Sequence, residues 1–135
     1  MSEKSYDFPE NCRYTDSDEW VRLEDGLALM GITDYAQSEL SDVVYVEQPE
    51  VGAQLEAGQN FGVVESVKAV GDLVAPLAGE VVRINTELED SPELVNEEPY
   101  GRGWLIALQP EDEEAVESLM TAEEYLRHVE ARSGA

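Results

Sequence analysis

The segment that most constrains the fold is a valine-rich run over residues 61–85, which reads FGVVESVKAVGDLVAPLAGEVVRIN. Its apolar residues form three short stretches, and residues typical of turns, such as those from Pro76 to Gly79, separate them. Valine is restricted in a helix but packs well on a pleated surface, so the run predicts three consecutive strands. Lys68 falls near the tight turn between the first two strands.

The segments before this run predict further strands and one helix. Glu24-Asp25-Gly26 is typical of a hairpin turn. Thr33 or Asp34 suits the N-cap of a short helix, because either side chain can accept a bond from a free backbone amide. The other expected strands cover residues 20–23, 28–32, 43–47 and 103–108, and the expected helix covers residues 35–40.

The last third of the chain changes character. Residues 86–100 hold two prolines and many acids, which predicts a surface loop with one short helical turn. From Glu111 the apolar spacing fits a helix face with a break near Thr121, and Thr121 with Glu124 fits a capping box. We therefore expect a mainly β fold, a small barrel or sandwich, with C-terminal helices over residues 111–131 packed on it.

The length of 135 residues fits a single domain, 1–135, with residues 1–12 as a polar lead-in. No apolar run approaches the roughly 18 residues of a membrane span, and the N-terminus lacks an apolar signal core. We therefore expect a soluble, cytoplasmic protein that does not enter a membrane.

Charge excludes some classes of partner. The chain has 31 acidic and 8 basic residues, a net charge of −23. Nucleic-acid binding depends on Lys and Arg, and anionic membranes attract the same residues, so neither partner is expected. Only Lys4 and Lys68 are lysines. Acid enrichment with lysine depletion is expected of a protein adapted to molar salt, and an acidic protein from a mesophile is the alternative.

The chain has no strong enzyme motif. Its single cysteine, Cys12, and single histidine, His128, cannot form an internal disulfide or a zinc site. A small hydrolase that uses Cys12 or His128 is conceivable, but both residues lie in terminal segments. Acid clusters such as residues 111–114 are typical of a solvated helix start and predict no metal site.

Lys68 allows three interpretations. It could be a solvated turn lysine that guards against edge pairing, as most turn lysines are. It could form a Schiff base, which requires a desolvated pocket that a small β domain has little room for. It could also be a covalent attachment point, because a primary amine on a rigid hairpin is reachable by a ligase. Glu65 before the turn and Asp72 after it leave the amine exposed.

The run GVVESVKA around Lys68, followed by APLAGEV, resembles the lipoyl-attachment hairpin of the glycine cleavage system H protein family. GITDYAQ, SDVVYVEQPEVG, ELVNEEPYG and Gly103-Trp104 resemble that family in the same order, from about Tyr14 to Tyr125. A biotin carrier would resemble Met-Lys-Met, whereas Val67 and Ala69 flank the lysine here. Lipoyl domains of 2-oxoacid dehydrogenases are shorter and lack the GITDYAQ region and the terminal helices.

The resemblance implies a flattened, lipoyl-domain-like barrel or sandwich and a carrier with no chemistry of its own. Lipoate would be amide-linked to Lys68, attached by a lipoate ligase or an octanoyltransferase. In the family, a pyridoxal-phosphate-dependent glycine decarboxylase loads an aminomethyl group on the arm. An aminomethyltransferase then unloads it, and dihydrolipoyl dehydrogenase reoxidises the dithiol. The alternative is a non-lipoylated scaffold or a lipoate-relay paralogue.

The resemblance also implies a cleft that shelters the loaded arm, with Ser17, Glu19 and Asp72 as candidate lining residues. The alternative is that Glu19 and Asp72 are ordinary surface acids. The family commonly has His-Glu-Trp where this chain has Asp18-Glu19-Trp20. This departure leaves the role of position 18 open.

Overall fold

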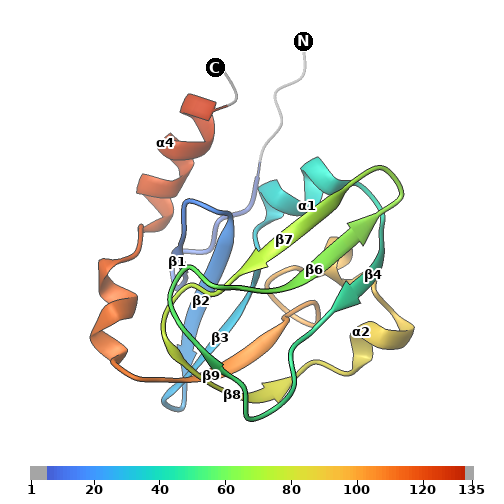
Figure 1. Ribbon diagram of the computed structural model, residues 1–135. Coiled ribbons are helices and arrows are strands. Elements are labelled where there is room, and N and C mark those ends of the chain that lie inside the picture. The colour runs from blue at the N-terminus through green and yellow to red at the C-terminus, as the bar shows by residue number, and fades with distance from the viewer. Residues whose placement is uncertain (1–5, 133–135) are drawn as a thin grey trace.

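The structure is a computed structural model that describes residues 6–132, so the predicted tail residue Lys4 lies outside the described residues. Two antiparallel sheets form the body of the protein, as predicted, one with six strands in the order β1-β2-β3-β9-β8-β5 and one with the order β4-β6-β7 (Figure 1). The strands are β1 Arg13–Tyr14, β2 Glu19–Glu24, β3 Leu27–Ile32, β4 Val43–Glu47, β5 Gln54–Leu55, β6 Asn60–Ser66, β7 Val70–Val74, β8 Gly79–Ile84 and β9 Ile106–Pro110.

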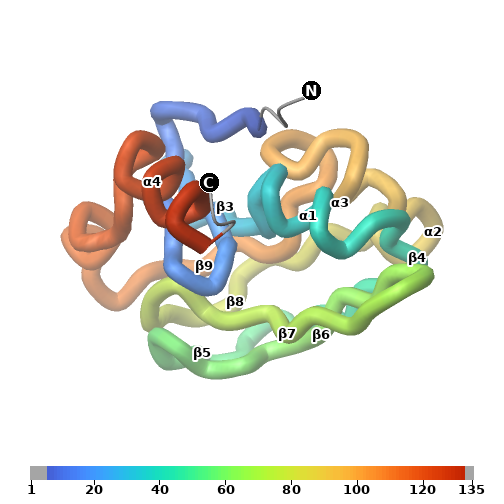
Figure 2. Tube along the Cα trace, turned by 90° about the horizontal axis from the view of Figure 1, so that it is seen from above, coloured from blue at the N-terminus to red at the C-terminus, as the bar shows by residue number. Residues whose placement is uncertain are grey.

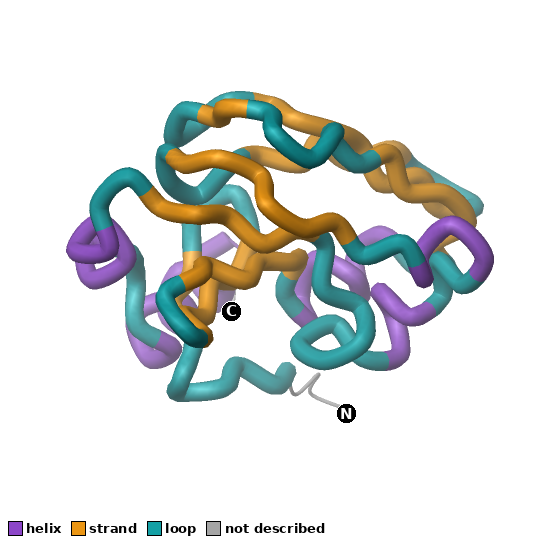
Figure 3. The backbone as a smooth tube through the Cα atoms, turned by 90° about the horizontal axis from the view of Figure 1, so that it is seen from below, coloured by secondary structure: helices purple, strands orange, loops and turns teal. Residues whose placement is uncertain are grey.

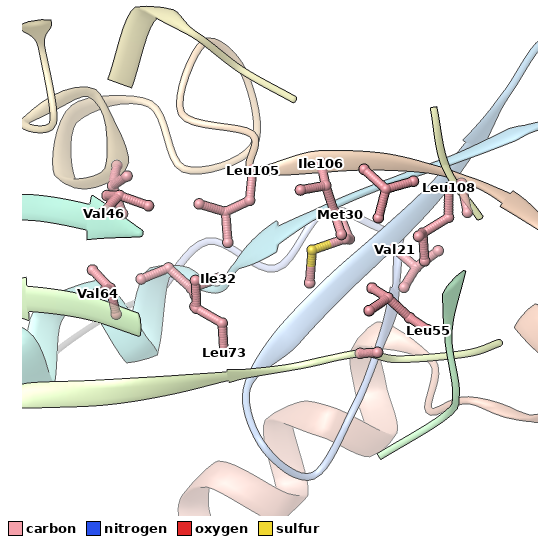
Figure 4. Close-up of a cluster of buried hydrophobic side chains, with 14 of the residues drawn as sticks. Val21, Met30, Ile32, Val46, Leu55, Val64, Leu73, Leu105, Ile106 and Leu108 are labelled. Atoms are coloured by element: carbon pink, nitrogen blue, oxygen red, sulfur yellow. The ribbon is translucent and has the colours of Figure 1, made fainter. Parts of the chain in front are cut away.

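The main apolar core fills the space between the two sheets. Val21 and Met30 face each other in the β2–β3 register and point into this core, where Val64 and Leu73 arrive from the smaller sheet (Figure 4). All four side chains are almost completely buried. The period of two in the strands therefore gives each sheet one apolar face, and the two faces pack together.

A second cluster covers the opposite face of β2 and β3. Trp20 and Gly31 pair across these strands, and a Cβ on Gly31 would lie 2.8 Å from the indole nitrogen of Trp20. Trp20 packs in this cluster with Tyr14 and Tyr125, and all three are fully buried. We expected residues 6–12 to be part of a polar lead-in. Tyr6, Phe8 and Cys12 instead pack in this apolar cluster.

The helices lie around the strand layers (Figure 3). Thr33 caps the first helix by accepting a bond from the Ala36 amide at 3.1 Å. The predicted capping box is also present, because the Thr121 amide donates to Glu124 and the Glu124 amide donates to Thr121 Oγ1. No helix within residues 6–132 is long and apolar enough to span a membrane. The helices are α1 Asp34–Leu40, α2 Glu87–Asp90, α3 Leu94–Glu97, the 3₁₀ helix η1 Glu113–Ser118 and α4 Ala122–Arg132.

Two boundaries correct the sequence-based expectations. Residues 86–100 form two short helices rather than a loop with one turn, because Leu88, Leu94 and Val95 are buried in the main core. The last strand begins at Ile106 rather than at residue 103, since the preceding backbone folds closely against α3. A Cβ on Gly103 would lie 2.5 Å from the Leu94 carbonyl oxygen.

Candidate functional site

Lys68 lies at the exposed tip of the β6–β7 hairpin. The last ladder pair is Glu65 with Val70, and the Ser66 amide donates to the Ala69 carbonyl at 2.8 Å to close the tip. Within the described residues, no hydrogen bond or ion pair engages the Lys68 ammonium. The amine is therefore presented to solvent on a short, closed turn.

The side chain of Ser66 holds this turn from inside. Its Oγ accepts bonds from the Ala69 amide at 3.0 Å and the Lys68 amide at 3.3 Å. The Val67 amide donates to the Asp42 carbonyl at 3.0 Å, which ties the tip to the chain before β4. These bonds use three consecutive amides, so the backbone on both sides of Lys68 is fixed.

A cleft of about 200 Å³ lies beside the hairpin, between β7, α1 and the loop that joins β1 to β2. Ser17, Glu19 and Asp72, which lie far apart in the sequence, all line it. Figure 2 shows α1 beside β6 and β7, the two strands that contribute Val64, Gly71 and Asp72 to the lining. The other lining residues are Asp18, Ile32, Ala36, Glu39, Leu40, Val64 and Gly71.

Glu19 is the buried acid of this cleft, with only 1% of its surface exposed. Its Oε1 accepts bonds from Ser17 Oγ at 2.6 Å and from Thr15 Oγ1 at 2.7 Å, and its Oε2 accepts from the Val74 amide at 3.3 Å. Burial raises the pKa of Glu19 to about 7, although the hydrogen bonds oppose the shift. Glu19 is therefore not a surface acid, which corrects the alternative considered for it.

Asp72 differs from Glu19, because it is exposed on the edge strand β7. It lies at the solvent side of the cleft, and Ser17 is likewise exposed. Glu39 on α1 and Asp18 add two more carboxyl groups to the lining. Asp18 is paired with Arg132, so Glu19, Glu39 and Asp72 are the acids that favour a cationic ligand with an apolar body in this small cleft.

Sequence analysis missed the contribution of α1. Ala36, Glu39 and Leu40 have the i, i+3, i+4 spacing of one helix face, and all three line the cleft. This periodicity is visible in the sequence. It does not show which other element the face meets, so it could not place these residues beside Lys68.

Cys12 and His128 do not form a hydrolase site. Cys12 is buried, its nearest polar partners are Asn11 and Arg22, and burial raises the pKa of its thiol. His128 lies on α4 beside a second cavity of about 510 Å³, which shares Ser17 with the cleft. The buried Nε2 of His128 has no hydrogen-bond partner among the described residues. A raised thiol pKa disfavours the thiolate that nucleophilic catalysis requires.

Comparison with known proteins agrees with this geometry. The family model described as "Glycine cleavage H-protein" matches residues 12–132. A glycine cleavage system H protein from Bacteroides thetaiotaomicron is 53% identical over 118 residues, which cover 87% of this chain and 94% of the relative. A probable glycine cleavage system H protein from Aeropyrum pernix is 52% identical over 120 residues, which cover 89% of this chain and 84% of the relative.

The fold agrees as well. The crystal structure of a glycine cleavage system H protein from Mycobacterium marinum superposes with a TM-score of 0.82 at 40% identity, covering 95% of this chain and all of that one. The family-model match over residues 12–132 spans the hairpin, the cleft and the C-terminal helix. The chain therefore belongs to the glycine cleavage H-protein family, the non-catalytic lipoyl carriers of the glycine cleavage system.

Proposed function

We propose that Lys68 is the residue of this carrier that holds lipoate, in amide linkage to its Nζ. The H-protein family carries lipoyl-lysine, and Lys68 is the only lysine within the described residues. Its amine is exposed and has no hydrogen-bond or ion-pair partner among residues 6–132, as acylation by a lipoate ligase or an octanoyltransferase requires. When bound, the lipoyl group supplies the dithiolane that takes up the aminomethyl group and the length that reaches other active sites.

The observation that carries this proposal is the closed hairpin tip. Ser66 and Asp42 restrain the backbone on both sides of Lys68, so the attachment point keeps its place. A restrained anchor limits the volume that a tethered group explores, which raises its effective concentration at a docked enzyme. The carrier would thereby serve several enzymes without chemistry of its own.

The partners in this proposal are three enzymes and a lipoylating enzyme. Membership of the glycine cleavage system implies its P, T and L proteins as partners. We assign them as the pyridoxal-phosphate-dependent glycine decarboxylase, the aminomethyltransferase and dihydrolipoyl dehydrogenase. Neither nucleic acid nor a membrane is a partner in this proposal, and the expected location is the cytoplasm.

We further propose that the cleft lined by Ser17, Glu19 and Asp72 shelters the loaded arm. The aminomethyl group carries a cationic amine that water can release. Asp72 at the rim would attract that amine, and Glu19 would neutralise it inside the cleft. A cation beside Glu19 favours the charged carboxylate and so offsets the desolvation that raises its pKa.

Intact mass tests the attachment site directly. The chain is produced in a lipoylating host, alongside Lys68→Arg and the matched variant Lys4→Arg. We expect the mass of one lipoyl amide on the parent chain and on Lys4→Arg, and none on Lys68→Arg, because guanidinium is not acylated like an amine. A lipoylated Lys68→Arg chain would contradict the assignment, and an unmodified parent chain would favour a non-lipoylated scaffold.

We also propose that the surface is adapted to high salt. The net charge is −23, whereas only four ion pairs join described side chains, so most acids face water without a basic partner. The small number of lysines and the small number of ion pairs both support adaptation to high salt. The test of this proposal is the dependence of Tm on KCl concentration.

A further inference from the structure

Asp18 connects the loop between β1 and β2 to the C-terminal helix α4. Its Oδ1 accepts a hydrogen bond from the Tyr125 hydroxyl at 2.8 Å and forms an ion pair with Arg132 at 2.5 Å. Thr33 Oγ1 lies 2.8 Å from the same tyrosine hydroxyl. Asp18 Oδ1 therefore accepts from two side chains of α4, and Tyr125 also contacts Thr33 at the start of α1.

The backbone of Asp18 is bent sharply at this point. Its φ is 75°, in the left-handed region that few residue types other than glycine adopt, with aspartate among those that do. The Asp18 amide donates to the Thr15 carbonyl, and the Asp18 carbonyl accepts from the Thr33 amide at 3.0 Å. The next residue is Glu19, so the bend determines where the Glu19 side chain begins.

We propose that Asp18, Tyr125 and Arg132 are positioning residues that hold Glu19 in place in the cleft. Contacts among the three residues attach the turn before Glu19 to α4. None of the three residues needs to touch the arm. The inference deepens the proposed shelter for the arm and rests on it for its functional meaning. The mechanical part of the inference can be tested without lipoate.

Arg132 extends the connection to the cleft wall. Its guanidinium carbon lies 5.0 Å from the centre of the Tyr35 ring on α1, the helix that lines the cleft. The loop, α1 and α4 therefore meet at one arginine. A carboxylate suits position 18, because it accepts hydrogen bonds and carries the negative charge that pairs with Arg132.

The Val74 amide offers a direct report on Glu19. It donates to Glu19 Oε2, whereas the next amide, that of Ala75, donates to Gln59. Val74 lies at the end of an edge strand, so loss of the Glu19 contact leaves its amide open to water. Its hydrogen-exchange rate therefore follows the position of the Glu19 carboxylate.

The experiment measures amide exchange by NMR in the unlipoylated full chain. The test variants are Arg132→Gln, Tyr125→Phe and their combination. Arg127→Gln is the matched control, since it removes an exposed arginine of α4 whose ion pair within residues 6–132 is with Glu123. We expect the Val74 amide to exchange several-fold faster in the double variant than in the parent chain. In Arg127→Gln it should exchange at the parent rate. Arg132→Lys, which keeps the positive charge, should retain most of the protection that Arg132→Gln loses.

Two results would overturn the inference. One is an unchanged Val74 rate in the double variant, and the other is equal acceleration of core amides such as that of Leu108 in β9, which indicates general destabilisation. Failure of the shelter itself has a different signature. In that case Glu19→Gln leaves the lifetime of the aminomethylated carrier unchanged, while the Val74 exchange rates still report whether α4 positions Glu19.

Discussion

The carboxylate of Glu19 joins the two sheets of the protein, because its Oε2 accepts a hydrogen bond from the Val74 backbone amide at 3.3 Å. Glu19 begins β2 in the larger sheet, and Val74 ends β7 in the smaller one. The bond also occupies an amide of an edge strand, which would otherwise be available to another chain. The buried carboxylate of Glu19 thus connects the larger sheet to the smaller one beside the cleft.

Burial of Glu19 predicts a pH dependence of stability. Its pKa is about 7 in the folded protein against an ordinary value of 4.5, so the folded state binds more protons between these two pH values. The contribution of this group to the free energy of unfolding is fully present below about pH 4.5. It is lost as pH rises through about 7, and the free energy of unfolding then falls by an amount on the order of 3 kcal/mol. Urea unfolding of the parent chain and of Glu19→Gln from pH 4.5 to 8 should show this difference.

The comparison needs a control, since many other acids titrate over the same range. Glu80→Gln, which changes an exposed acid of β8, should keep the pH dependence of the parent chain. Parallel pH profiles for the parent chain and Glu19→Gln would show that Glu19 does not have a raised pKa.

Removing a cleft acid should shorten the life of the loaded carrier. Asp72→Ala deletes the exposed carboxylate at the cleft, and we expect release of the aminomethyl group to accelerate several-fold. Glu19→Ala should act in the same direction and also lower stability. Release is measured on the isolated loaded protein as formaldehyde or ammonia, with Glu80→Ala as the charge-matched control. Equal lifetimes for all these proteins would remove the case for a sheltering cleft.

Ser66 should control the order of the hairpin tip. Ser66→Ala removes the acceptor of the Lys68 and Ala69 amides, so both should exchange faster, and stability should fall by about 0.5–1.5 kcal/mol. Ser118→Ala, which removes only an exposed bond to the Ala115 carbonyl, should leave the tip unchanged. Unaltered exchange at residues 68 and 69 would mean that the strands alone hold the turn.

The charge of −23 predicts strong salt dependence. The Debye length falls from about 30 Å at 0.01 M to about 3 Å at 1 M, so salt relieves repulsion that penalises the compact state more than the unfolded one. We expect Tm to rise steeply as KCl increases to molar concentration. Screening alone should saturate below about 1 M, whereas adaptation to high salt predicts a continued rise. A flat Tm would exclude both effects.

Much of the strand framework could be predicted because it depends on local signals. The Asp25–Gly26 turn has positive φ at both residues, as a two-residue hairpin requires, and the β6–β7 hairpin follows the valine pattern. The capping box at Thr121 is equally local. The resemblance added Ser17, Glu19 and Asp72, and the structure brings these three residues to one cleft.

The features that escaped prediction depend on contacts between distant segments. The acidic stretch forms two helices because the side chains of Leu88 and Val95 are buried in the main core. The prolines and acids around these two residues indicate a surface loop, so the sequence does not predict their burial. Asp18 appeared only as a departure from the family pattern. Its partners Tyr125 and Arg132 lie more than 100 residues away, and nothing in their spacing indicates the contact.

Tyr35 brings together the two ends of the described chain. The ring of Tyr6 meets it edge-on at 5.3 Å between centroids, and the guanidinium of Arg132 lies over it at 5.0 Å. Such proximity is what circular permutation requires, because a short linker can then join the two ends of the described chain, Tyr6 and Arg132. New ends opened at the exposed Asp25–Gly26 turn would leave the lysine hairpin unbroken. We therefore expect a chain permuted in this way to keep the arrangement of strands that presents Lys68.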